Sequence, residues 1–499
     1  MENENLKPQL PFFSIGKPEV ILGFLTLVLG IFTSNAVITG GFNLGYALGM
    51  TAMILAAWIY LWSHSPKGGW YGKALLVLAL IIVLGFGRSD DPFVKLVMVS
   101  FLFVAINLGL CDRAGKTTRD TGSVRSLDDC FRTGFGWGVG KIGYTFRGIS
   151  VGLQTGSAAV KSGSAVVLGL VIAVPVLAVM IPLLMNADAA FEGVLNLLPQ
   201  IDVEEIFWSI AFGVGVTCLV VTRALSLAFL PKKVNHYEKM NKGINALTVN
   251  TVLGCVCGLY GVYLLSQLAY LSGGFAGILP EGYTVAEYAR RGFFEMAWLC
   301  GINLTVMILA ISMTEKQQGK TPFPTRGLCL GLGVVTLFLV CTAGAKMVLY
   351  IGSFGMTRLR VLTMVIMVFM GLTTAAVSVW LFVPRLPYMR VVVLSALVLG
   401  AAVLWTDVDT VVARYNVDSY LNGRLETVDV SYLNTLGNGA VPALERLYLE
   451  AENRQVGELA REKLQYRAYK TRIQDYRDWN LTDALAWNIL EQYSITEEK

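Results

Sequence analysis

Charged residues are scarce in this sequence: lysine, arginine, aspartate and glutamate make up 15% of its 499 residues, against roughly a quarter in an ordinary soluble domain. Histidine is rarer still. The two histidines, His64 and His236, exclude most histidine-based zinc sites and catalytic triads. The last of the eight cysteines is Cys341, so the C-terminal part of the chain holds no disulfide framework. The net charge of +5 is small and the basic residues are spread over short loops, which argues against a nucleic-acid-binding protein.

Apolar residues are abundant instead and account for 55% of the chain. A soluble protein of this length could not bury so much apolar surface in one or two cores, which excludes a soluble enzyme, a secreted disulfide scaffold and a disordered chain. A membrane-spanning helix needs about 20 mostly apolar residues, and we count eleven candidate runs. They cover residues 20–38, 44–62, 70–87, 93–110, 165–184, 206–229, 246–271, 293–313, 327–351, 361–383 and 391–405. We therefore expect an all-α fold, a polytopic bundle of about eleven membrane helices with a small soluble C-terminal helical domain.

The distribution of lysine and arginine predicts the orientation. The loop 111–162 carries eight of these residues, the loop after the sixth span four and the loop after the eighth three, whereas 186–205 carries none. Because cytoplasmic loops hold the excess of basic residues, the N-terminus should be cytoplasmic and, with an odd number of spans, the C-terminus outside the bacterial plasma membrane. The expected organisation is a cytoplasmic N-terminus (1–19), a four-span segment (20–110), a basic glycine-rich cytoplasmic loop (111–162), a seven-span core (163–406) and an extracytoplasmic helical domain (407–499).

The tail has a composition close to that of a soluble domain, with 16 acidic and 11 basic residues between Asp407 and Lys499. Pro442 suits the first turn of a helix. A second helix is expected over 456–475, where opposite charges recur three and four residues apart, and Thr482 is expected to cap a last helix. These patterns predict a minimal helical domain.

The sharpest polar signal precedes the eighth span. Thr284 and Glu287 form a capping box, so a helix should start there and continue into the span. Glu287, Arg291 and Glu295 share one face of that helix, and Arg290 lies close to Glu287. Two interpretations stay open: a ladder of salt bridges that anchors the helix at the interface, or a site for an anionic or zwitterionic headgroup or substrate, since ionisable groups near the membrane are costly and often functional.

A second polar cluster lies at the end of the ninth span. Lys346 either snorkels outward or pairs with a carboxylate at similar depth, such as Glu295. Arg358 and Arg360 fall on the predicted outer side, against the positive-inside bias, and suit phosphate or carboxylate. The hypothetical ligand site therefore comprises eight residues: Glu287, Arg290, Arg291, Glu295, Lys346, Tyr350, Arg358 and Arg360.

Three further segments have plainer interpretations. The segment from Arg88 to Pro92 should be a turn in which Pro92 starts the next helix, and Asp188 should also lie in a plain turn. The glycine-rich stretch 133–156 is a weak match to a phosphate-binding loop, because Ile142 stands where serine or threonine is required. We expect this stretch to lie on the inner membrane surface.

Two segments combine several uncommon residues: AEYARRGFFEM at 286–296 and LYIGSFGMTRLRVLT at 349–363. They resemble the hallmark segments of a bacterial membrane family, Domain of Unknown Function 4173, which has a sibling family numbered 4153. The turn RSDDPF and the segments MNADAAF, VARYNVDSYL and AVPAL are similar to it too. Phe354 stands where the family usually has tyrosine, and Met356 where it often has leucine. The resemblance implies many membrane spans in bacteria, a polar C-terminal extension and no established activity or cofactor.

Three hypotheses of function follow. The first is a binding protein of the bacterial cell envelope, a sensor or scaffold that binds membrane lipid at its outer-face polar site and an envelope or signalling protein through its tail. The second is a transporter or flippase of an amphiphilic or anionic substrate, with Lys346 and Glu295 on the pathway. The third is a membrane-embedded transferase that uses Asp90, Asp91 or Asp188. Because no catalytic constellation is visible, we expect binding rather than catalysis, with no metal, no cofactor and no nucleic acid.

Overall fold

The structure is a computed structural model. It describes residues 13–64, 68–117, 125–163, single positions between 165 and 180, 203–230, 243–274, 293–316, 321–383, 385–470 and 476–493. Within these ranges the regular structure is helical, and one isolated bridge joins Ile244 to Thr314. The prediction of an all-α fold is confirmed.

Ten helices coincide with predicted spans, because long apolar runs without interior breakers form helices of membrane length. They are α1 (Lys17–Gly40), α2 (Leu44–His64), α3 (Trp70–Gly85), α4 (Pro92–Arg113), α9 (Val203–Phe229), α10 (Ala246–Gly274), α12 (Phe293–Met313), α13 (Phe323–Phe354), α14 (Arg358–Phe382) and α15 (Tyr388–Thr406). Eight of them are long and apolar enough to cross a membrane, while α3 and the apolar part of α12, Trp298–Met313, are shorter. The span predicted at 165–184 lies outside the described residues, apart from single positions.

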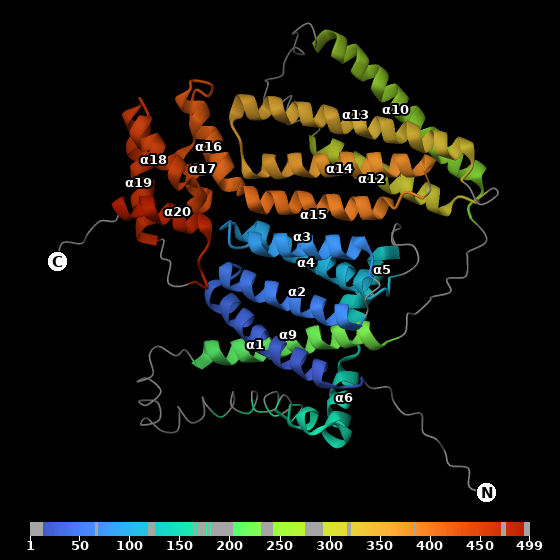
Figure 1. Cartoon of the computed structure of the whole chain (residues 1–499). Coiled ribbons are helices and arrows are strands. Elements are labelled where there is room, and N and C mark those ends of the chain that lie inside the picture. Colours follow the sequence, from blue (N-terminus) through green and yellow to red (C-terminus); the bar gives the residue numbers. More distant parts are fainter. Residues whose placement is uncertain are drawn as a thin grey trace, which may run out of the picture. The chain divides into compact units, whose positions relative to one another are not determined.

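The first compact unit comprises residues 1–233, 400–407 and 470–488. In it α1 packs along α9 and α2, and α3 packs along α4 (Figure 1). The helices α1 and α9 approach closely at a glycine crossing: a Cβ atom added to Gly30 would lie 2.7 Å from the carbonyl oxygen of Gly213. Small residues at such crossings let membrane helices pack backbone against backbone.

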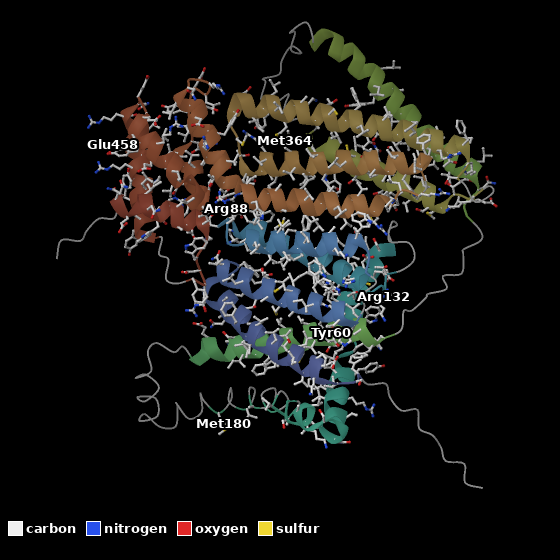
Figure 2. The ribbon with its side chains drawn as sticks, viewed as in Figure 1. Tyr60, Arg88, Arg132, Met180, Met364 and Glu458 are labelled. Atoms are coloured by element: carbon white, nitrogen blue, oxygen red, sulfur yellow. The ribbon has the colours of Figure 1, made fainter. Side chains whose placement is uncertain are left out.

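The loop that the sequence predicts between the fourth and fifth spans is largely helical. It contains α5 (Arg125–Phe131), a π-helical turn (Arg132–Gly136) and α6 (Ile142–Thr155). Figure 2 marks Arg88 and Arg132 at opposite ends of the helices of this unit.

The second compact unit comprises residues 234–399, 408–469 and 489–499. In it α13 packs against α10, α12 and α14. A buried polar network joins three of these helices: Tyr260 donates to Asn303 Oδ1 (2.9 Å), and Asn303 Nδ2 donates to Thr336 Oγ1 (3.1 Å). Because every partner is uncharged and hydrogen-bonded, the network fixes the helix register at little desolvation cost.

The described part of the tail is helical, as predicted. It contains α16 (Val408–Leu421), α17 (Val430–Thr435), a short turn η2 (Gly437–Ala440), α18 (Val441–Glu450), α19 (Arg454–Lys470), α20 (Leu481–Leu490) and η3 (Glu491–Tyr493). Pro442 lies in the first turn of α18, as expected. The prediction that Thr482 caps the last helix is wrong: α20 begins at Leu481, and Asn480 Oδ1 accepts the N–H of Asp483 (2.9 Å). The Thr482 hydroxyl lies inside the first turn and donates to Asp407 Oδ2 (2.7 Å).

Candidate functional site

The turn between α13 and α14 gathers the described residues of the hypothetical ligand site. Helix α13 ends at Phe354 and is followed by Gly355, whose φ of 75° is a left-handed conformation that favours glycine. Helix α14 starts after Thr357, whose hydroxyl accepts the N–H of Arg360 (3.3 Å) as an N-cap. The chain thus reverses within three residues, which places Arg358 and Arg360 directly beside the end of α13.

A buried ion pair connects this turn to α16. Arg358 Nε donates to Asp409 Oδ1 (2.7 Å), and Arg358 Nη2 donates to Asp409 Oδ2. The Asp409 side chain is 1% exposed and that of Arg358 30%. A two-point guanidinium–carboxylate contact fixes orientation as well as distance, so the start of α16 is held at one position on the turn.

The backbone of the turn is held by two more side chains. The N–H of Arg358 donates to the hydroxyl oxygen of Tyr432 (2.9 Å), and burial raises the pKa of that hydroxyl. Asn416 bonds both sides of Met356: its Oδ1 accepts the Met356 N–H (2.6 Å) and its Nδ2 donates to the Met356 carbonyl (2.8 Å). A Cβ atom on Gly355 would lie 2.7 Å from Asn416 Oδ1, so glycine is required here for space as well as conformation. Together with the ion pair, these contacts form what we call the α16 latch.

Arg360 donates hydrogen bonds to carbonyls at the end of α13 and not to α16. Its Nη1 donates to the carbonyls of Phe354 (3.1 Å) and Gly355, and its guanidinium lies 4.0 Å from the ring centroid of Tyr350. These carbonyls have no partner within the helix, and a cation at a helix C-terminus is favourable. The structure therefore gives Arg360 and Tyr350 a capping role, whether or not they also meet a ligand.

The opposite face of α16 lines a cleft of about 330 Å³ between α16, η2 and α18. Arg414 and Asp418 line it from α16, and Arg446 lines it from α18. Arg446 donates to Asp418 and, through Nε, to Glu450 (3.0 Å), while Arg414 Nε lies 3.7 Å from Asp418 Oδ2. The cleft therefore presents both signs of charge beside apolar walls.

The eight predicted ligand-site residues fall into three groups. Tyr350, Arg358 and Arg360 meet at the turn, and Lys346 lies one helical turn before Tyr350 on α13 and is partly buried. Glu295 lies in α12, but its side chain is outside the described residues. Glu287, Arg290 and Arg291 are also outside them, as are the capping box at Thr284 and the candidate Asp188. That these groups converge on one ligand stays a prediction.

A second buried polar cluster lies in the first unit, where α3 ends and α4 begins. Asp91 caps α4 by accepting the N–H groups of Phe93 (2.9 Å) and Val94 (3.2 Å), so the expected turn is present. One turn further along α4, Lys95 is 5% exposed and donates to Asn43 Oδ1.

The cluster extends to Asp407, which follows α15. Asp407 is buried and has φ of 51°, which is uncommon for a residue other than glycine. Its Oδ2 lies 3.9 Å from Arg88 Nη1. Sequence reasoning missed Lys95 and Asp407. A lysine inside an apolar run was the available signal for Lys95, and Asp407 had none.

A return segment, residues 477–482, connects this cluster to the ends of α1 and α2. The N–H of Leu44 donates to the Trp479 carbonyl (3.1 Å), and the N–H of Leu481 donates to the Gly87 carbonyl (2.9 Å). Arg477 Nη1 donates to Asn35 Oδ1 (3.0 Å) and lies 3.2 Å from Glu205 Oε1. Gly40 has no room for a side chain because an added Cβ would overlap the Arg477 backbone.

The fold and these contacts define a class: an all-α, multi-pass membrane protein with soluble helices tied to its membrane helices by buried polar contacts. The chain belongs to the family Domain of unknown function (DUF4153), which matches residues 20–447. This is the family that the sequence resemblance placed as the sibling of family 4173. The match runs from α1 into α18 and so includes the turn, the α16 latch and every residue that lines the cleft. Comparisons with curated proteins and with solved structures found no match.

Proposed function

We propose that this protein works by binding, as a sensor or scaffold in the plasma membrane of bacteria, with the N-terminus in the cytoplasm and the tail on the outer side. The cleft between α16, η2 and α18 receives a segment of an envelope or signalling protein. The α16 latch couples binding in the cleft to the membrane helices α13 and α14. Membrane lipid surrounds the polar turn at the outer face.

The observation that carries the proposal is the double role of α16. Asp409 and Asn416 are seven residues apart and lie on the face that holds the turn, whereas Arg414 and Asp418 are four apart and line the cleft. A single rigid helix therefore contacts both the cleft and the turn that starts α14. If a bound partner displaced α16, the displacement would act directly on the turn that connects α13 to α14.

The placement of charge supports binding rather than transport of ions. In the ten described membrane helices, charged side chains lie near helix ends, and the deepest, Lys346, is eight residues from the end of α13. The described interior network around Asn303 is uncharged. A proton- or ion-coupled pathway would need ionisable groups near the membrane midplane.

The chemistry of the cleft favours a protein segment as its ligand. Arg414 and Arg446 line the cleft together with Asp418, and Arg446 also pairs with the neighbouring Glu450, so a ligand meets both signs of charge. A polypeptide offers carboxylate, amine and backbone groups together, and short surface ion pairs of this kind exchange partners at small cost.

Site-specific photocrosslinking in native membranes tests the proposal. A photoreactive amino acid at Pro442, an exposed residue that lines the cleft, should yield a discrete protein adduct. The same group at Glu458, which projects from α19 (Figure 2), should not. Both positions lie on tail helices of one unit, so expression and accessibility are matched.

Charge reversal then tests the recognition. Arg446→Glu should lower the adduct at position 442, because it removes the arginine that a partner carboxylate would meet and places a third negative charge beside Asp418 and Glu450. Arg461→Glu on α19, at a similarly exposed arginine, should leave the adduct unchanged. Equal adducts at both positions, or an adduct that is insensitive to Arg446→Glu, would refute the cleft as the partner site.

A further inference from the structure

A second surface feature lies in the first unit, far along the chain from the cleft. An apolar groove runs between α1, α6 and α9. Its walls are formed by one side of each helix, with these residues among them: Gly23, Leu27, Phe146, Ile149, Val214 and Val221.

The polar groups in the groove wall are already engaged within the protein. The hydroxyl groups of Thr145 and Thr222 bond each other (2.8 Å), and Thr217 Oγ1 donates to the Thr26 carbonyl (2.9 Å). Glu19 accepts the N–H of Gly16 (2.7 Å) and the hydroxyl of Tyr60 (2.9 Å). Among the described residues, the groove therefore offers its occupant mainly hydrocarbon contacts, with the weakly polar Cys218 thiol among them, which fits an acyl chain better than a polar ligand.

The helices that form the groove differ in direction and in composition. Helices α1 and α9 are apolar enough to cross a membrane, whereas α6 crosses their direction (Figure 1). Helix α6 has an apolar side with Ile142 and Ile149 in the groove, and Arg147 lies exposed on another side. A short amphipathic helix with a basic side and this orientation lies in the headgroup region.

Close contacts with the start of the chain hold α6 in place. The N–H of Phe13 donates to the Tyr144 carbonyl (3.4 Å), and the Phe13 ring packs on Tyr144 and Phe229. At Gly148 an added Cβ would overlap the Phe13 carbonyl oxygen and lie 3.1 Å from Ile15 Cγ1. The groove is thus a built feature with a fixed wall.

Two exposed cations adjoin the groove along the chain: Arg147 follows Phe146, and Lys17 lies between Ile15 and Glu19, all three of which line the groove. Gly148 packs against residues 13–15, so its neighbour Arg147 lies near the start of α1, where Lys17 is also exposed. We propose that the groove binds one acyl chain of an anionic phospholipid whose phosphate pairs with Arg147 and Lys17. The positive-inside orientation places this lipid in the cytoplasmic leaflet, where anionic headgroups favour basic surfaces.

Photoreactive lipids test this proposal on the full chain in nanodiscs. The probes are phosphatidylglycerol and phosphatidylcholine with the same diazirine on one acyl chain, and labelled peptides are identified by mass spectrometry. Labelling should concentrate in residues 13–27, 142–149 and 214–222, and phosphatidylglycerol should label them more strongly. Arg147→Gln should lower the ratio of the two labels about fivefold, because one basic residue near a membrane surface contributes about 1 kcal/mol.

Two glycines provide a matched pair for the groove itself. A Cβ at either Gly23 or Gly215 meets no atom within 4 Å, but only Gly23 lines the groove. Gly23→Leu should remove the groove labelling, and Gly215→Leu should leave it intact. Ile149→Gln, which makes the wall polar without added bulk, should also reduce it, so the result does not rest on one variant that could misfold.

Three outcomes would overturn the proposal. Equal labelling in Gly23→Leu and Gly215→Leu would show that the label comes from general lipid contact. Equal labelling by both headgroups would remove the role of Arg147 and Lys17. Unlabelled groove peptides in the unmodified protein would mean that another helix or a second copy occupies the groove.

Discussion

The buried ion pair between Arg358 and Asp409 leads to a quantitative prediction. Asp409→Asn keeps the shape of the side chain but removes the charge that Arg358 meets at two points. Loss of one partner of a fully buried pair costs about 3 to 5 kcal/mol. Because the Arg358 side chain is 30% exposed and can be partly rehydrated, we expect a smaller loss, about 2 to 3 kcal/mol.

Hydrogen exchange of the α16 amides measures this loss directly, since opening of the α16 latch exposes them. A loss of about 2 to 3 kcal/mol should speed exchange about 30- to 150-fold. Arg358→Met should speed it further, because this variant takes the guanidinium away from a carboxylate that is only 1% exposed. Exchange should therefore be fastest in Arg358→Met, slower in Asp409→Asn and slowest in the unmodified protein, because the two partners are unequally buried.

Asp418→Asn is the matched control, with the same substitution on the same helix. Its carboxylate is 35% exposed and pairs with exposed arginines, so exchange should change less than about fivefold. If Asp409→Asn and Asp418→Asn gave the same exchange rates, burial would not be what makes the latch strong, and the reasoning would fail.

Three further predictions follow from the packing. Gly213→Ala should lower thermal stability in detergent, since its Cβ would lie 2.6 Å from the α1 backbone, whereas Gly215→Ala has open space and should be neutral or stabilising by up to about 1 kcal/mol. The raised pKa of Tyr432 means that its neutral form is favoured in the folded state, so its contribution to stability is complete below pH 10.0 and is lost as the pH rises. Tyr432→Phe should therefore flatten the loss of stability at alkaline pH. At neutral pH it should cost about 1 kcal/mol, because the bond from the Arg358 N–H is lost, and hydrogen exchange of the α17 amides measures both effects. Asn480→Ala should cost about 1 kcal/mol through the lost cap of α20, seen as faster exchange in its first turn.

The membrane helices could be predicted closely because the signal is local. A run such as 361–383 is apolar throughout, and the structure has α14 from Arg358 to Phe382. Arg358 and Arg360 were also found from sequence, because charge is scarce and two arginines beside a span stand out.

Their partners could not be found in this way. Asp409 is 51 residues from Arg358 and Asp407 is 318 from Ser89, and composition carries no information about which distant segments meet. The same limit explains the error at Thr482. Its local pattern predicts a cap, but a tertiary contact with Asp407 uses the hydroxyl.

The return segment has a consequence for how the protein is made. Asn43 Nδ2 donates to the Asp478 backbone carbonyl (3.0 Å) across 435 positions of the chain, so α1 and α2 leave the ribosome long before the residues that complete them. Until then the N–H of Leu44 and the amide of Asn43 lack the carbonyls of Trp479 and Asp478 as partners. Residues 477–482 thus couple the folding of α1 and α2 to a segment that is made much later.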